Sequence, residues 1–287
     1  MPQNGGTMNV AFCTYRKWAY DIAAELARHR GKWGLTKAVG AIGEEAPIET
    51  LAPTGKKIDP KELEILFKDG FFGDIDVLLM YGWSWILPKE MVKEKVCLAL
   101  HPSPLPKYRG GSPIQNQIIN GERKSAVSIF RMTDKLDAGL LFAQEEISFE
   151  GHLNEILGRM TSVGTRLSLE ILDKIAEGTI SPKEQKGEPT IVRRRKPEQS
   201  ELTKEFLHKA DSTKLFNFCR ALEDPYPNPF VAVADGIVKI SWTRVSAVPD
   251  GKAVKADDIC ALRKRDFRGA VSVLCSDKKY VVIEKAA

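Results

Sequence analysis

The sequence predicts an α/β protein with a doubly wound, mostly parallel sheet, followed by a smaller β-rich unit. Three observations support this fold class. Short apolar runs alternate with amphipathic stretches over residues 8–178, as strands and helices do in parallel sheets. Residues 179–200 are rich in proline, glycine and charge, which is typical of a linker. Beyond residue 200, short strand-like runs between turn residues predict a small sheet or barrel.

The first predicted domain, 8–178, begins with a strand and a helix. Residues 9–13 form an apolar run, and the apolar positions of 17–28 recur at helical spacing. The first strand-to-helix turn has no glycine, which excludes a dinucleotide-binding fingerprint. The same alternation predicts strands at 38–42, 76–81 and 96–100 and helices at 60–68 and 88–95.

Capping signals define the remaining helices of this domain. Ser112 followed by Pro113 is a cap and first-turn pair, so a helix is expected over 113–120, ended by Gly121. Recurring apolar positions over 153–176 predict a long amphipathic helix that closes the domain. The remaining strands are expected at 126–132 and 140–147.

The linker prediction covers 179–200, and a second, smaller unit is expected over 201–287. This unit begins with a helix at 213–222 and breaks at the proline-rich stretch 224–229. Residues 1–7 are expected to be a loose leader. The strands of the second unit are expected at 230–234, 238–245, 270–274 and 280–283.

Composition and charge narrow the class of protein. The 287 residues contain 43% hydrophobic and 28% charged side chains, which excludes disorder, collagen and a membrane span. The net charge is +5, yet residues 191–287 alone hold 19 basic and 13 acidic side chains. This surplus suits a phosphate-bearing partner but falls short of a dedicated nucleic-acid binder. Five cysteines without CxxC spacing and four scattered histidines predict reduced thiols, a cytoplasmic location and no metal site.

Two loops at predicted strand ends carry the candidate chemistry. His101 follows the strand 96–100 and opens a loop rich in proline and glycine, and parallel sheets bind ligands at the carboxyl ends of their strands. Asp137 lies in the loop after 126–132, where it could orient an imidazole. We expect the two side chains to converge at one cleft. The alternatives are an ordinary histidine and a solvated turn aspartate.

The stretch 99–115 reads ALHPSPLPKYRGGSPIQ. Together with Asn120-Gly-Glu122 and Leu136-Asp-Ala-Gly139, it resembles the signature of the folate-dependent formyltransferases, enzymes that use 10-formyltetrahydrofolate. The likeness extends over about residues 75–245 through YGWSWILP at 81–88, RRKP at 194–197 and RALEDPYP at 220–227. The resemblance implies a Rossmann-like catalytic domain and a small, OB-like carboxyl-terminal β subdomain.

By this resemblance His101 and Asp137 match the family's catalytic histidine and aspartate. Where the family pattern has asparagine, this sequence has Ala99, which has no donor for the oxyanion of a tetrahedral intermediate. Three interpretations stay open. His101, a backbone amide or a water replaces the donor; the chain is an engineered or slow variant; or it is a catalytically impaired binder of folate or nucleotide sugar.

The resemblance also implies the binding residues. The folate is expected against Tyr81, Gly82, Trp83, Trp85, Ile86, Leu87, Thr133 and Ala138, bonded mainly by backbone. The acceptor is expected against Lys107, Tyr108, Arg109, Gly110 and Gln115. Independently of the resemblance, Arg16, Arg193 and Arg194 are candidates for binding its diphosphate, since a guanidinium matches phosphate oxygens. Core packing is the alternative for the tryptophans, and a solvated charge cluster is the alternative for the arginines near 194.

The resemblance allows three kinds of amine acceptor. The first is glycinamide ribonucleotide, but a purine-pathway enzyme of this family would not need the carboxyl-terminal extension. The basic patch at 263–268 favours initiator methionyl-tRNA, but the segment 43–47 is short and acidic, whereas the tRNA enzymes typically carry a longer basic insertion near there. A nucleotide-diphosphate amino sugar is therefore the expected partner, with tRNA as the alternative and no membrane partner. The sequence leaves open a monomer or a homodimer.

Overall fold

The computed structural model describes residues 7–29, 31–43 and 47–285, and the chain divides into two compact units. The first runs through Gly110 and also includes Ser125–Ile147 and Leu157–Ile191. The second contains Gly111–Lys124, Ser148–Ile156 and the chain from Val192 onward. The units are thus interleaved in sequence, and the consecutive domains expected at 8–178 and 201–287 stay a prediction. The expected leader, 1–7, lies outside the described residues except for Thr7.

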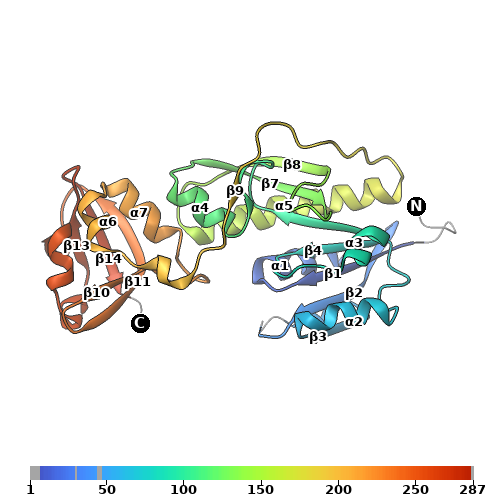
Figure 1. Cartoon of the computed structure of the whole chain (residues 1–287), viewed down its shortest axis with the longest axis horizontal. Helices are drawn as coiled ribbons and strands as arrows, with labels where there is room; N and C mark the ends of the chain where they lie inside the picture. Colours follow the sequence, from blue (N-terminus) through green and yellow to red (C-terminus); the bar gives the residue numbers. More distant parts are fainter. Residues whose placement is uncertain (1–6, 30, 44–46, 286–287) are drawn as a thin grey trace. The chain divides into compact units, whose positions relative to one another are not determined.

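A seven-stranded sheet forms the centre of the first unit in the described part of the chain, in the order β3-β2-β1-β4-β5-β7-β8 (Figure 1). The pairs from β3 to β5 are parallel, whereas β7 runs antiparallel to β5. The strands are β1 (Met8–Thr14), β2 (Trp33–Ala41), β3 (Thr54–Ile58), β4 (Val77–Tyr81), β5 (Val96–His101), β7 (Lys124–Arg131) and β8 (Leu141–Ser148). The expected mostly parallel sheet is confirmed. Strand β3 was not predicted, because its residues TGKKI form no apolar run.

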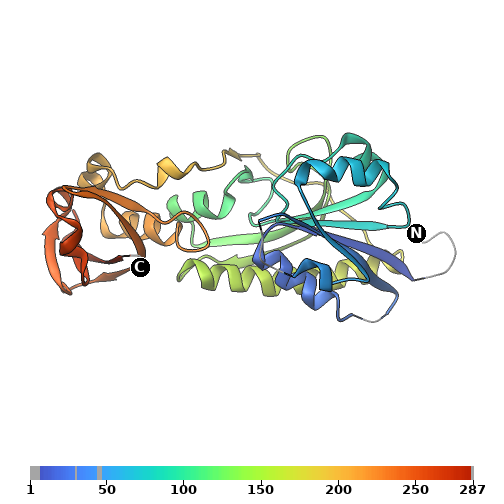
Figure 2. The same ribbon diagram turned by 90° about the horizontal axis from the view of Figure 1, so that it is seen from below.

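Helices cover both faces of this sheet. Figure 2 shows α1 (Lys17–Leu26) and α5 (Leu153–Ala176) on one side and α2 (Leu63–Lys68) and α3 (Lys89–Glu94) on the other. Side chains alternate along each strand, so Met80 packs in a core cluster with residues of α2 and α3, whereas the neighbouring Tyr81 hydroxyl lies 3.0 Å from the Ser168 hydroxyl of α5. This is the doubly wound arrangement that the alternation predicted.

The same alternation decides which way β5 presents its last residues. Cys97 belongs to the cluster that packs against α2 and α3. Because strand side chains have a period of two, Ala99 and His101 lie on that same face. The strand therefore brings Ala99 and His101 side by side at the carboxyl edge of the sheet.

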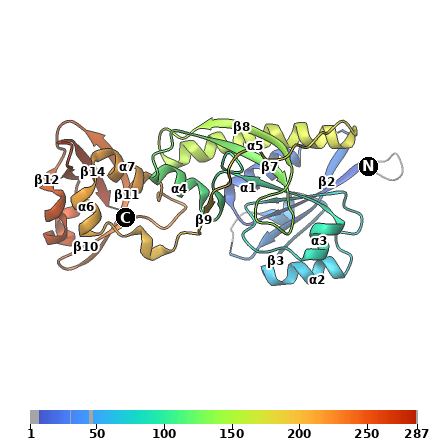
Figure 3. The ribbon, with the colours of Figure 1, turned by 45° about the horizontal axis from the view of Figure 1, so that its top comes forward.

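The second unit contains a five-stranded sheet among its described residues, in the order β10-β11-β14-β13-β12. Only the β12–β13 pair is parallel, and α7 (Ser212–Arg220) contacts β11 and β14 (Figure 3). The strands are β10 (Phe230–Val233), β11 (Gly236–Ser246), β12 (Lys252–Lys255), β13 (Val271–Leu274) and β14 (Tyr280–Lys285). The expected β-rich unit is confirmed, whereas β12 and the short helix α6 (Lys204–Lys209) were not predicted.

The expected cap of α4 (Pro113–Ile119) is wrong in one respect. Pro113 opens the helix as predicted, but Ser112 has φ 52° and makes no side-chain cap. Its hydroxyl instead accepts a hydrogen bond from the backbone N–H of Arg195 at 3.1 Å. The expected local capping bond is therefore replaced by a tertiary contact. The Ser112 hydroxyl bonds to the donor that the fold brings near it, the Arg195 N–H.

Three properties of the described residues bear on the class of protein. No helix among them has the length and apolar character needed to cross a membrane. They contain no group of three or more His, Cys, Asp or Glu placed to hold a metal ion. The cysteines in this part of the chain form no disulfide, and burial raises the pKa of the Cys97 and Cys275 thiols to about 12.

Candidate active site

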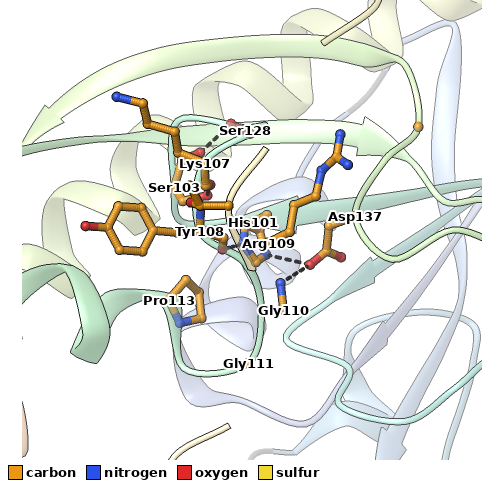
Figure 4. Close-up of polar contacts among 12 residues, drawn as sticks. His101, Ser103, Lys107, Tyr108, Arg109, Gly110, Gly111, Pro113, Ser128 and Asp137 are labelled. Carbon is orange, nitrogen blue, oxygen red and sulfur yellow. Dashed lines mark hydrogen bonds and ion pairs between the residues drawn. The ribbon is translucent and has the colours of Figure 1, made fainter. Parts of the chain in front are cut away.

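His101 is the last residue of β5, and its side chain is only 9% exposed. Its Nε2 donates to the backbone oxygen of Tyr108 at 2.8 Å (Figure 4). Tyr108 has φ 58°, a conformation that L residues adopt rarely and that surrounding contacts must hold. The opposite ring nitrogen, Nδ1, faces Asp137. The imidazole is therefore oriented by backbone on one side and faces a carboxylate on the other.

Asp137 comes from the loop that follows β7. Its Oδ2 accepts the backbone N–H of Gly110 at 2.7 Å and lies 3.7 Å from His101 Nδ1. A separation of 3.7 Å is longer than a hydrogen bond, so the carboxylate is held by Gly110 rather than by the imidazole. Asp137 has φ 47°, which aspartate tolerates better than most residues. The expected convergence of the two side chains is confirmed, while their catalytic roles stay a prediction.

Polar contacts fix the loop that begins at His101. The Ser103 hydroxyl donates to the Lys107 oxygen at 2.7 Å, and the Ser128 hydroxyl donates to the Ser103 oxygen at 2.6 Å. The Gln144 amide donates to the Leu105 oxygen at 3.0 Å and to the Ser128 hydroxyl at 2.8 Å. Side chains of strands β7 and β8 thus hold the loop, in addition to the stiffness that its prolines provide.

The segment 183–190, which lies within the linker expected at 179–200, holds both loops. Lys183 and Leu141 exchange two backbone hydrogen bonds. The Thr190 hydroxyl accepts from Tyr108 N at 2.7 Å, and the Gln185 amide contacts both loops. Gln185 and Thr190 were not predicted as site residues, since these bonds join residues 46 to 82 positions apart and leave no local signal in the sequence.

Ala99 lies in an apolar environment two residues before His101. It is 9% exposed and packs with Leu105 and Phe130, against which Met132 and Leu141 also pack. The position at which the family pattern has an amide thus presents a methyl group to hydrocarbon. Ala99 therefore supplies no side-chain donor to an oxyanion.

Residues 81–88 divide into buried and exposed members. Tyr81 is fully buried, and its hydroxyl lies 3.0 Å from the Ser168 hydroxyl. Trp83 packs against the core, and its Nε1 has no hydrogen-bond partner among the described residues. Trp85 is 38% exposed and makes edge-to-face contacts with Trp83 and Tyr15. Ile86 is 98% exposed, while Leu87 is buried and Gly82 has φ 65°. Trp83 therefore lies in the core environment that was the alternative, Trp85 is partly exposed, and contact of this stretch with a folate stays a prediction.

The other expected folate contacts come from the loop 133–139. Thr133 is exposed, and its hydroxyl accepts the N–H of Lys135 at 3.2 Å. Ala138 is half-buried. Leu136 and Leu140, on either side of Asp137, are exposed apolar side chains. Contact between this loop and a folate stays a prediction.

The expected acceptor residues are divided between the units: Arg16, Lys107, Tyr108, Arg109 and Gly110 belong to the first, and Gln115, Arg193 and Arg194 belong to the second. In the first unit, Arg16 follows β1, and its side-chain carbons lie 3.0 Å from where a Cβ on Gly82 would stand. The Arg109 guanidinium is bonded to Gln185. In the second unit, Gln115 is buried and its Nε2 has no hydrogen-bond partner among the described residues.

The three consecutive arginines of the second unit have different surroundings. Arg193 and Arg194 are exposed. Arg195 donates to the Gln199 oxygen and lies 5.7 Å from the centre of the Phe218 ring, and burial lowers the pKa of its guanidinium. Only the first two are therefore open to a phosphate.

Comparisons with known proteins agree with these motifs. Residues 62–160 match the family model described as Formyl transferase. A methionyl-tRNA formyltransferase of Thermodesulfovibrio yellowstonii is 35% identical over 185 residues, which is 62% of this chain and 58% of that protein. The chain thus spans little more than half the length of this relative.

Solved structures share the fold. Methionyl-tRNA formyltransferase from Clostridium thermocellum aligns with a TM-score of 0.65 and 26% identity, over 83% of this chain and 93% of its own. WlaRD, a sugar 3N-formyltransferase crystallised with dTDP and 5-N-formyl-THF, aligns with a TM-score of 0.68 over 98% of both chains. At 13% identity, this second likeness shows the fold alone.

Proposed function

We propose that this chain, a relative of the folate-dependent formyltransferases, transfers a formyl group from 10-formyltetrahydrofolate to the amine of a nucleotide-linked amino sugar. The observation that carries the proposal is the placement of His101 Nδ1 3.7 Å from Asp137 Oδ2 at the carboxyl edge of the sheet. Both residues stand in the formyltransferase motif, and the surrounding backbone orients both of them.

The proposed mechanism assigns separate tasks to the two side chains. The neutral acceptor amine attacks the formyl carbon and a new C–N bond forms. The amine loses one proton, the bond from that carbon to N10 of the folate breaks, and N10 takes up a proton, so that tetrahydrofolate leaves. His101 stabilises the negative charge that develops on the formyl oxygen and takes part in proton transfer. Asp137 places its negative charge 3.7 Å from Nδ1 of the imidazole and accepts the proton of the amine, directly or through water.

The folate is proposed to lie against residues 81–88 and the loop 133–139. The exposed side chains of Trp85, Ile86 and Leu136 support this placement, because an aromatic ligand gains from burying apolar surface. The polar part of the folate would then rely on backbone groups.

A nucleotide-diphosphate sugar as acceptor draws support from two observations. The sugar 3N-formyltransferase WlaRD shares the fold over 98% of both chains and was crystallised with dTDP. Arg193 and Arg194 are exposed, and guanidinium groups bind phosphate oxygens in a fork. Residues Glu44–Ala46 of the short acidic segment 43–47 lie outside the described residues. The structure therefore gives this part of the argument no support.

Methionyl-tRNA formylation is the second candidate. The name of the Thermodesulfovibrio relative favours it, as does the surplus of basic side chains after residue 190. A third interpretation, from a different class, is a catalytically impaired folate or nucleotide-sugar binding protein, and Ala99 is the observation that motivates it.

A turnover assay separates these candidates. Release of tetrahydrofolate is measured with 10-formyltetrahydrofolate and a panel of UDP- and dTDP-linked amino sugars or charged initiator tRNA. Release with one amino sugar is expected, and His101→Asn should lower kcat by about 100-fold to 10,000-fold. Release with tRNA alone would overturn the sugar proposal. Binding of both ligands without release would favour the binding protein, and a parental rate in His101→Asn would exclude the catalytic assignment of His101.

A further inference from the structure

Gln185 joins the loop of His101 to the loop of Asp137. Its Nε2 donates to the backbone oxygens of Asp137 at 2.8 Å and Gly139 at 2.9 Å. Its Oε1 accepts from the Arg109 guanidinium, at 2.6 Å from Nη2 and 3.3 Å from Nε. Both N–H groups and the oxygen of this half-buried amide are therefore satisfied.

These contacts lie directly beside the bond that holds the carboxylate. Arg109 precedes Gly110, whose N–H donates to Asp137 Oδ2 at 2.7 Å. Gln185 thus bonds to Arg109, the neighbour of Gly110, and to the backbone oxygen of Asp137 itself. The backbone of Asp137, with φ 47°, persists in this rarely populated region only if surrounding contacts hold it.

The main chain around Gln185 is itself anchored on both sides. Before it, Lys183 and Leu141 exchange backbone hydrogen bonds of 2.7 and 2.8 Å. After it, the Thr190 oxygen accepts from Arg109 N at 2.8 Å. A side chain on a segment fixed at both ends has a defined position, and it can transmit that position to the groups it bonds.

We infer that Gln185 is a positioning residue that sets the distance between the Asp137 carboxylate and the His101 imidazole. The kinetic consequence rests on the proposed function, whereas the geometric part does not. Two substitutions of Gln185 distinguish its contact with Arg109 from its contacts with the two carbonyl oxygens. Gln185→Glu keeps an acceptor for Arg109 but offers no donor to the two carbonyl oxygens, and Gln185→Leu offers neither.

The first test needs no substrate. The imidazole signals of the full chain are recorded by NMR, and the His101 signal is assigned by its loss in His101→Asn. We expect this signal to move in both Gln185 variants and to stay in place in Lys186→Gln. That control lowers the net charge by the same amount as Gln185→Glu, at an exposed neighbouring residue. An unmoved His101 signal in both Gln185 variants would overturn the inference.

The second test measures formyl transfer to the acceptor found active. Gln185→Leu should lower kcat by about tenfold to a hundredfold while both KM values stay within about twofold, because a displacement of about 1 Å can cost that much. In an Asp137→Asn background, Gln185→Leu should lower kcat by less than about twofold. An equal loss in that background would overturn the inference. A parent chain without any turnover would contradict the proposed function, while the NMR result would still decide the role of Gln185.

Discussion

At the scale of single residues, the pair His101 and Asp137 is held by backbone groups on loops rather than by a bond between the two side chains. Tyr108 and Gly110, which supply the backbone oxygen and N–H for this, lie in the same short loop. A small movement of that loop would therefore change the position of both side chains together. Such coupling explains why polar side chains outside the pair, such as Ser103 and Gln185, bond to this loop.

Ala99 is the residue at which the chemistry departs from the family pattern. We expect Ala99→Asn to raise kcat for formyl transfer by about tenfold or more, because one donor to an oxyanion contributes about 100-fold to 1000-fold in another enzyme. The same substitution should lower the free energy of unfolding by about 1–3 kcal/mol, since it places an amide among Leu105, Phe130 and their apolar neighbours. Steady-state kinetics and urea unfolding measure the two effects.

Ala99→Val serves as the control, because it adds bulk without adding a donor. An unchanged kcat in Ala99→Asn, with the fold intact, would mean that another group already supplies the missing donor. That outcome would select the first of the three interpretations of Ala99. A rise in kcat with valine as well would show that bulk rather than hydrogen bonding matters at this position.

At the scale of elements, helix termini are satisfied by distant side chains as well as by local caps. The N-terminus of α7 shows this plainly. Asp211 caps the helix locally through the N–H of Lys214 at 2.8 Å. Asp277, in the turn between β13 and β14, accepts from Ser212 N at 3.1 Å and from the Ser212 hydroxyl at 2.6 Å. The turn of the sheet is thereby tied to the helix that packs on it.

Asp277 makes this tie dependent on pH. Burial alone would raise the pKa of its carboxyl, but the hydrogen bonds from Ser212 and nearby backbone lower it overall. A lowered pKa in the folded state means that the ionised carboxylate stabilises the fold above the unfolded-state pKa of about 3.9. This stabilisation is lost as the pH falls through the folded-state pKa.

We therefore expect Asp277→Asn to lower the free energy of unfolding at pH 7 by about 0.5 kcal/mol, a small value because the carboxylate is largely exposed. The difference from the parent chain should shrink toward pH 3, where the parental carboxyl is also neutral. Urea unfolding at several pH values measures this. Asp258→Asn, an exposed position in the same unit, is the control, and an equal loss there or a loss independent of pH would contradict the argument.

At the scale of the whole molecule, the chain is built from two interleaved units with unequal charge. The chain from Val192 belongs to the second unit, and this region has a net charge of +6, compared with +5 for the whole chain. A basic surplus attracts any phosphate-bearing partner, so charge alone does not select between a diphosphate sugar and tRNA. The response to salt does select between them.

With a diphosphate sugar as acceptor, KM should change by less than about tenfold between 50 and 200 mM salt, because only a few charges are neutralised. Binding of tRNA through six to ten phosphates would weaken by about 1000-fold to 100,000-fold over the same range. Initial rates at each salt concentration measure the difference, with the unfolding midpoint as a control for stability. A steep fall in acceptor affinity would contradict the sugar proposal.

The sequence by itself determined most of the strands and helices, the mostly parallel sheet, the β-rich second unit and the position of His101 at a strand end. These follow from local periodicity and from the rule that ligands meet the carboxyl ends of parallel strands. Only the tertiary structure decided that Ser112 bonds to Arg195 rather than capping α4, that Thr54–Ile58 adds an edge strand, and that Gln185 ties two loops together. Such contacts depend on which distant groups the fold brings within hydrogen-bond distance, and no pattern in neighbouring residues records that.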